Sequence, residues 1–422
     1  MKYNFYLLII FTLLNPYIGL SIFPSDTQPF AVLFSFVYIV FYFYYKNKIY
    51  FPRVVLPFLA LLLFSIFSFL IKIFAIKADF IDNLRYLYSY ITPVSIILFV
   101  YTLKNKLNFV KLTKNSVDIF IFFCFLGFFF NLFDIDIPKY FVNRAKFEDI
   151  SHGRGLTGFF PEQSRVSEQC SMIFFIYYLV VGVSLRRFFC LFLIANLSFA
   201  GQFFIQLFFI FLSFVCAQFI LRQRLKSLFI KSFLLLCVSL CSYYLFINLA
   251  DLLVNLGVPS RGVVAIKIVL THGLYGWSED SGIIIKVSGL FSMISAILSV
   301  PLNFQLGSFS NPEFIDTIST NYSQVQNFVF NNPNPKIPSR VYSALGLYIV
   351  DYGIIGLFAV FYILIFLFNG LRKRKFIIIW SSIFLLFCLF VKLNLANPTL
   401  WFLFALIHFK FSFQNFKLLR CQ

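Results

Sequence analysis

Residues 354–391 read IIGLFAVFYILIFLFNGLRKRKFIIIWSSIFLLFCLFV, in which two apolar runs flank the basic cluster Arg372–Lys375. Each run approaches the ~20 apolar residues that cross the ~30 Å hydrocarbon core of a bilayer. A cluster of lysine and arginine between such runs is typical of a loop on the cytoplasmic side of a membrane. This stretch therefore predicts two membrane-spanning helices joined by a cytoplasmic loop.

The whole chain shares this composition. Of its 422 residues, 60% are hydrophobic and 12% are charged, and the mean hydropathy is +0.88. A soluble protein carries about 25% charged residues, because its surface must face water. These values exclude a soluble globular protein, and they predict an all-α, polytopic membrane helix bundle.

Twelve apolar segments are candidates for membrane-spanning helices, and they lie at 4–22, 29–45, 54–71, 86–103, 117–133, 170–185, 188–200, 203–221, 232–250, 343–369, 376–391 and 397–409. The pair within 188–221 could instead be one helix and a re-entrant segment. The N-terminal run lacks a small-x-small cleavage site and is expected to be a retained first helix.

The chain is expected to be organised in five regions. Helices 1–5 occupy residues 1–133, a first outer loop 134–169, helices 6–9 residues 170–250, a large second outer loop 251–342, and helices 10–12 with a tail 343–422. The net charge is +19, and most basic residues fall on one side of this arrangement. The positive-inside rule therefore predicts cytoplasmic N- and C-termini. The basic runs are explained as topology determinants and lipid-headgroup contacts, so nucleic acid is not an expected partner.

The first outer loop gathers charged residues before a predicted helix. Arginine suits phosphate groups because its planar fork donates two parallel hydrogen bonds, and Arg154 and Arg165 are candidates for this role. Glutamate can act as a general base when burial and neighbours tune it, and Glu162 and Glu168 are candidates. The alternative is internal Arg–Glu pairing without a ligand.

The second outer loop contains Arg261 and His272, and Arg340 precedes the helix that follows. A single loop histidine is more often a surface residue than a catalyst. The apolar stretch 282–302 is interpreted as an amphipathic interfacial helix, because a further crossing would place Arg372–Lys375 outside.

Asp351 lies in the predicted span 343–369. An intramembrane charge normally faces a water-filled cavity or a partner, although a helix beginning near residue 341 would place Asp351 at the outer interface. Asp134-Ile135-Asp136 has the form of a metal-binding DxD, but a solvated helix end is the favoured reading. The sequence contains no CxxC and no spaced Cys/His set, so no metal site is expected.

Three segments resemble the bacterial O-antigen polymerases. Arg154–Ser164, RGLTGFFPEQS, is similar to the family's Arg–Gly–aromatic–Glu–Pro–Ser pattern, with Gln163 at the usual proline. Ser288–Gly307 is similar to a second-loop block, although Leu290 stands where the family has arginine. Ser339–Leu357 is similar to a return helix with a GiiG turn, here Gly353–Gly356.

The resemblance implies a periplasmic reaction at the bacterial inner membrane. Such polymerases take an undecaprenyl-pyrophosphate-linked oligosaccharide as donor and transfer the growing glycan to a second lipid-linked repeat unit. It implies catalytic roles for Glu162 and Asp351, and pyrophosphate or glycan contacts by Arg154, Arg165, Arg261, Arg340 and His272. Arg261 is the candidate substitute for the missing family arginine. No metal or cofactor is implied, and a chain-length regulator is an expected partner.

Two other functions stay open. The related O-antigen ligases share this architecture, but Glu162/Ser164 and Ser339/Arg340 occupy the places where ligases usually show Gly–Asn–Pro–Asn and histidine motifs. A lipid-linked oligosaccharide flippase or other transporter also has about twelve spans. It should carry its charges inside the bundle, whereas the charges of this sequence gather in the two outer loops.

Overall fold

The computed structural model describes residues 2–17, 28–46, 51–74, 80–103, 109–133, 135–142, 156–161, 163–198, 201–221, 294, 297–298, 343–371, 375–391 and 395–409. Within these residues the regular structure is helical, without strands. The all-α prediction is therefore confirmed for the described part of the chain.

The helices overlap the predicted apolar segments, except for the short helix Ile137–Phe141, which lies in the predicted first outer loop. They are α1 (Lys2–Leu14), α2 (Phe30–Lys46), η1 (Arg53–Val55), α3 (Leu56–Phe74), α4 (Phe80–Leu103), α5 (Phe109–Leu132), α6 (Ile137–Phe141), α7 (Gln163–Val180), α8 (Leu185–Leu197), α9 (Gly201–Ile220), α14 (Ala344–Tyr352), α15 (Ile354–Leu371), α16 (Phe376–Val391) and α17 (Pro398–Phe409). The predicted segment 232–250 lies outside the described residues.

Membrane-crossing potential differs among these helices. Arg53–Phe74, Tyr86–Leu103 and Phe109–Leu132 are long and apolar enough to cross a bilayer, by length and composition. The shorter apolar helices are Asn4–Leu14, Phe30–Lys46, Gln206–Ile220, Ile354–Asn369, Phe376–Phe390 and Pro398–Phe409. The protein is accordingly a helical membrane protein.

The predicted span 343–369 is divided into two helices. α14 ends at Gly353, which has a φ of 54° that side-chain-bearing residues rarely adopt. Gly356, in the first turn of α15, approaches the α14 backbone so closely that a Cβ would lie 1.8 Å from the carbonyl oxygen of Tyr348. The Gly353–Gly356 segment is therefore a tight turn, and the helix cannot continue straight through it.

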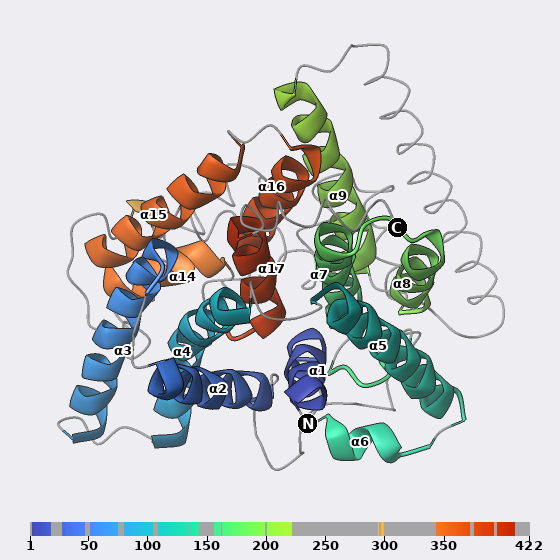
Figure 1. Ribbon diagram of the computed structural model, residues 1–422, viewed down its shortest axis with the longest axis horizontal. Coiled ribbons are helices and arrows are strands. Elements are labelled where there is room, and N and C mark those ends of the chain that lie inside the picture. The colour runs from blue at the N-terminus through green and yellow to red at the C-terminus, as the bar shows by residue number, and fades with distance from the viewer. Residues whose placement is uncertain are drawn as a thin grey trace, which may run out of the picture.

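α17 lies at the centre of the bundle, between α4, α7, α16 and α1 (Figure 1). Nearly all of its side chains are buried, including Trp401 and Phe402. A helix that is apolar on all sides is expected in the interior of a bundle. This short C-terminal helix is consequently the core around which the longer helices pack.

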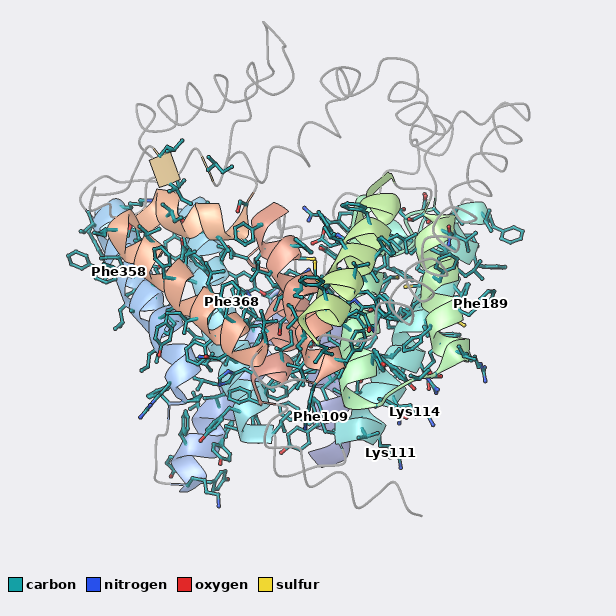
Figure 2. All side chains as sticks on the ribbon, turned by 90° about the horizontal axis from the view of Figure 1, so that it is seen from above. Phe109, Lys111, Lys114, Phe189, Phe358 and Phe368 are labelled. Atoms are coloured by element: carbon teal, nitrogen blue, oxygen red, sulfur yellow. The ribbon has the colours of Figure 1, made fainter. Side chains whose placement is uncertain are left out.

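The flanks of the bundle expose apolar side chains. Phe358 on α15 and Phe189 on α8 are exposed and lie on opposite flanks (Figure 2), and Phe368 on α15 is exposed as well. Lys111 and Lys114, near the beginning of α5, lie together at one edge (Figure 2). An exposed apolar surface of this kind is unfavourable in water, whereas it is favourable in contact with lipid chains.

Only residues 294, 297 and 298 are described within the predicted interfacial helix 282–302. These residues are helical, and their side chains Ile294, Ile297 and Leu298 are exposed. The remainder of this predicted helix lies outside the described residues.

Candidate functional site

Three of the site candidates predicted from the sequence, Arg165, Glu168 and Asp351, fall in the described part of the chain. The other predicted site residues lie outside it, namely Arg154, Glu162, Arg261, His272 and Arg340. Of the four arginines expected to contact pyrophosphate or glycan, the structure therefore describes Arg165 alone.

The segment that carries the family resemblance is buried against α5. Residues 157–161 are buried, and the backbone N–H of Gly158 donates a hydrogen bond to Oδ1 of Asn131. A Cβ on Gly127 would lie 2.8 Å from the Cα of Gly158, so α5 and this segment touch through their backbones. Gly158 itself has a φ of 56°, which favours glycine there.

Further contacts fix the same segment to other helices. The backbone N–H of Leu156 donates to the carbonyl of Leu197 at the end of α8 (3.2 Å). The Phe160 ring packs on Tyr17, with ring centroids 5.6 Å apart, and on Phe120. Because α7 begins at Gln163, directly after this anchored segment, its first turns are held in a defined place.

Arg165 and Glu168 form an ion pair within the first turns of α7, with Nη1 and Oε2 3.4 Å apart. Glu168 is 1% exposed, whereas the Arg165 side chain is 15% exposed. Arg165 and Glu168 thus form the internal Arg–Glu pair that the sequence analysis gave as the alternative to ligand binding. The paired guanidinium still reaches the surface, so it can meet a phosphate that approaches from outside.

Neighbouring polar groups tie α7 to the centre of the bundle. The Gln169 amide donates to the carbonyl of Leu14 on α1 (2.8 Å) and to Oγ1 of Thr399 on α17 (2.7 Å). Asn397 precedes α17 and accepts a hydrogen bond from the Thr399 N–H. Buried polar groups of this kind specify one packing arrangement, because any other would leave them unsatisfied.

Asp351 lies in a second buried polar cluster, formed by α3, α4 and α14. The carboxyl group is 0% exposed, and its Oδ2 accepts a hydrogen bond from the Tyr90 hydroxyl. The Tyr86 and Tyr90 hydroxyls are 3.4 Å apart, and the ammonium group of Lys72 lies 5.1 Å from the centroid of the Tyr86 ring. Asp351 therefore faces a packed polar network.

The same cluster continues on the other side of Tyr90. Its ring packs on Tyr348 and Tyr352, with centroids 5.7 and 5.3 Å apart. The Tyr352 hydroxyl is 2.5 Å from that of Ser65 on α3. Three helices that are distant in the sequence thus share one set of hydroxyl groups.

Lys72, Tyr86 and Tyr90 were not identified as site residues from the sequence. Two signals point to them in retrospect. Lys72 lies in the last turn of an otherwise apolar helix, and a charge beside such a segment calls for a partner. Tyr86 and Tyr90 are four residues apart, so they share a helix face, but the helix that they meet cannot be deduced from this spacing.

Asp136, from the DxD sequence, is exposed before α6, and Asp134 lies outside the described residues. Among the residues that the structure describes, no group of three or more His, Cys, Asp and Glu side chains could hold a metal ion.

No protein-family model matches this chain, and no match was found among curated proteins or solved structures.

Proposed function

We propose that this protein is a glycan polymerase of the bacterial inner membrane. It joins undecaprenyl-pyrophosphate-linked repeat units into O-antigen or a similar surface polysaccharide at the periplasmic face. In this proposal the chain crosses the membrane about twelve times, both termini are cytoplasmic, and residues 134–169 and 251–342 are periplasmic.

The arrangement around residues 156–161 is the observation that supports this proposal best. The segment that resembles the polymerase motif is buried against α5, and it leads directly into the helix that carries Arg165 and Glu168. A motif segment that served only as a surface connection would not need the backbone-to-backbone contact of Gly127 and Gly158. Its burial is what a segment that positions reactive side chains requires.

The proposed reaction has two chemical needs. Negative charge develops on the lipid pyrophosphate as it leaves, and preorganised guanidinium groups stabilise such charge where it forms. Arg154, Arg165, Arg261 and Arg340 are the proposed donors, with His272 beside them. The acceptor hydroxyl needs a base, and Glu162 is proposed for this role, with Asp351 or Glu168 as the alternatives.

The lipid tails of donor and acceptor need an apolar path. Exposed phenylalanines on α15 and α8 supply a surface of this type (Figure 2). The proposed partners are therefore the two lipid-linked glycans, membrane lipids and a chain-length regulator.

Substitution followed by measurement of glycan length tests the proposal. Glu162→Gln, Arg154→Ala and Arg261→Ala are each expressed in a source strain that lacks the native gene, and Asp136→Asn serves as a carboxylate control. The expected result is a surface glycan of one repeat unit for the three variants and full-length chains for the control. Normal long chains from all three variants end the assignment.

A transporter is the second candidate, and one observation favours it. Lys72 and Asp351 are buried within helices, and a flippase is expected to keep charges inside its bundle. The deletion strain separates the two functions. A lipopolysaccharide core capped with a single repeat unit indicates a polymerase, and a core without repeats indicates a flippase or a ligase.

A further inference from the structure

The burial of Asp351 poses an energetic problem. An ionised carboxylate in a low-dielectric interior costs several kcal/mol unless it is paired with a charge and hydrogen-bonded. The Tyr90 hydroxyl satisfies part of the hydrogen-bonding need. The hydroxyl carries no positive charge, so a cationic side chain close to Asp351 would lower this cost.

Lys72 is the basic side chain that the described contacts bring to this cluster. It is 5% exposed, and its ammonium group lies over the face of the Tyr86 ring. Its charge interacts electrostatically with Asp351. An ammonium group over a tyrosine ring is stabilised by the negative face of the ring, most strongly where water is excluded. Lys72 therefore lies over the Tyr86 ring and within electrostatic range of Asp351.

We propose that Lys72 is the counter-charge of Asp351, and that the two form one buried pair bridged by Tyr86 and Tyr90. The bridge runs from the Lys72 ammonium to the Tyr86 ring, between the two tyrosine hydroxyls, and from Tyr90 to the carboxylate. Lys72 is a positioning residue, since it acts on Asp351 through the tyrosines.

The location of the pair fixes the position of α14 in the bundle. Asp351 lies in the last turn of α14, and Gly353 then turns the chain into α15. Ser343 caps the other end of α14 by accepting a hydrogen bond from the N–H of Gly346, and the predicted outer loop with Arg340 ends just before it. The pair therefore locks α14 onto α3 and α4, and it sets where this loop re-enters the bundle.

A double-mutant cycle tests the pair in the full-length protein. Lys72→Met, Asp351→Asn and the double variant are purified in detergent, and the midpoint of thermal unfolding is measured. Each single variant leaves one buried charge without its partner and is expected to lower the midpoint by about 5 °C or more. The double variant removes both charges and is expected to lie above the lower of the two single variants.

Two further variants separate charge from packing. Lys72→Arg keeps the charge and is expected to lie closer to the wild type than Lys72→Met does. Lys46→Met removes an exposed lysine at the end of α2 and is expected to leave the midpoint unchanged. If a single variant does not yield folded protein, recovery of a monodisperse gel-filtration peak by the double variant replaces the midpoint as the readout.

The inference depends on the proposed function only where glycan length is measured. The pair is overturned if the double variant lowers the unfolding midpoint by the sum of the two single decreases, whatever the length of the glycan. It is also overturned if Lys72→Arg lowers the midpoint as much as Lys72→Met does. The midpoint decreases can be non-additive while Asp351→Asn still makes full-length glycan. That result supports the pair and excludes Asp351 from the proposed catalytic role.

Discussion

Two carboxylates are buried in the part of the chain that the structure describes, Glu168 and Asp351, and they obtain their partners in opposite ways. Glu168 pairs with Arg165, three residues earlier on the same helix. Asp351 is bonded by Tyr90, which is 261 positions away, and it shares its cluster with Lys72 on a third helix. The first pair forms whenever α7 is helical, whereas the second exists only when α3, α4 and α14 have assembled.

Because of this difference, substitutions in the Asp351 cluster should disturb the tertiary structure more than substitutions at the Arg165–Glu168 pair. A change at Glu168 removes a pair within α7 and releases a guanidinium group that can turn toward solvent or lipid headgroups. A change at Asp351 or at the turn beside it affects the contact of three helices at once. Variants of the α14 region should therefore be the more damaging.

Gly356→Ala is expected to have the largest effect. The new Cβ would lie 1.8 Å from the Tyr348 carbonyl oxygen. The position of the Cβ is fixed by the backbone and the oxygen belongs to the backbone, so neither atom can rotate aside. The turn must open, and Asp351 and Tyr352 must then leave α4. We expect a loss of more than about 4 kcal/mol of stability, or no folded protein, measured by thermal unfolding in detergent and by gel filtration.

Gly182→Ala is the matched control. Gly182 has a positive φ, 108°, which Gly356 does not, and a Cβ there has no heavy atom within 4 Å. Only backbone strain of about 1–2 kcal/mol is expected. Equal damage from both alanines would show that the close approach at Gly356 is not what fixes α14.

The next comparison is between the carboxylates themselves. Asp351→Asn leaves a buried lysine without its counter-charge, for which about 3–5 kcal/mol is expected. Glu168→Gln keeps a hydrogen-bonding oxygen and frees a partly exposed arginine, so about 1–2 kcal/mol is expected. Thermal unfolding of the two variants at one pH makes the comparison. A larger loss from Glu168→Gln would reverse the ranking of the two clusters.

Asn131→Leu tests the anchor of the segment before α7. Its Oδ1 accepts hydrogen bonds from the Gly158 N–H and, at 3.4 Å, from the Thr157 hydroxyl. The substitution leaves these buried donors unsatisfied, at a cost of about 1–3 kcal/mol. Thr157→Val removes only the longer bond and should cost less. If Asn131→Leu also shortens the glycan while Thr157→Val does not, the anchor positions the reactive side chains of the proposed polymerase.

Much of the fold could be predicted from the sequence, because apolar length alone defines a membrane helix. The break within 343–369 could not, although Gly353 and Gly356 were visible, because a glycine pair does not reveal which backbone atom lies against it. At the candidate site, Asp351 was recognised as an intramembrane charge. Lys72 was not recognised as its partner, because Lys72 lies just beyond the predicted span 54–71 and the contact of α3 with α14 depends on packing between distant segments.

Breaking the exposed ion pair of Asp118 and Arg187 is expected to have the smallest effect on stability. It contrasts most clearly with breaking the buried pair of Lys72 and Asp351. Nε and Nη2 of Arg187 each donate to an oxygen of Asp118 at 2.7 Å, yet 47% of the Asp118 side chain is exposed. Asp118→Asn is expected to cost about 0.2–1 kcal/mol, and the cost should vanish in 1 M salt, where charges are screened beyond about 3 Å. The cost of Asp351→Asn should persist at that salt concentration, because ions do not reach a side chain that is 0% exposed. Unfolding midpoints of both variants at low and high salt make the test, and a salt-sensitive Asp351→Asn would mean that water reaches the cluster.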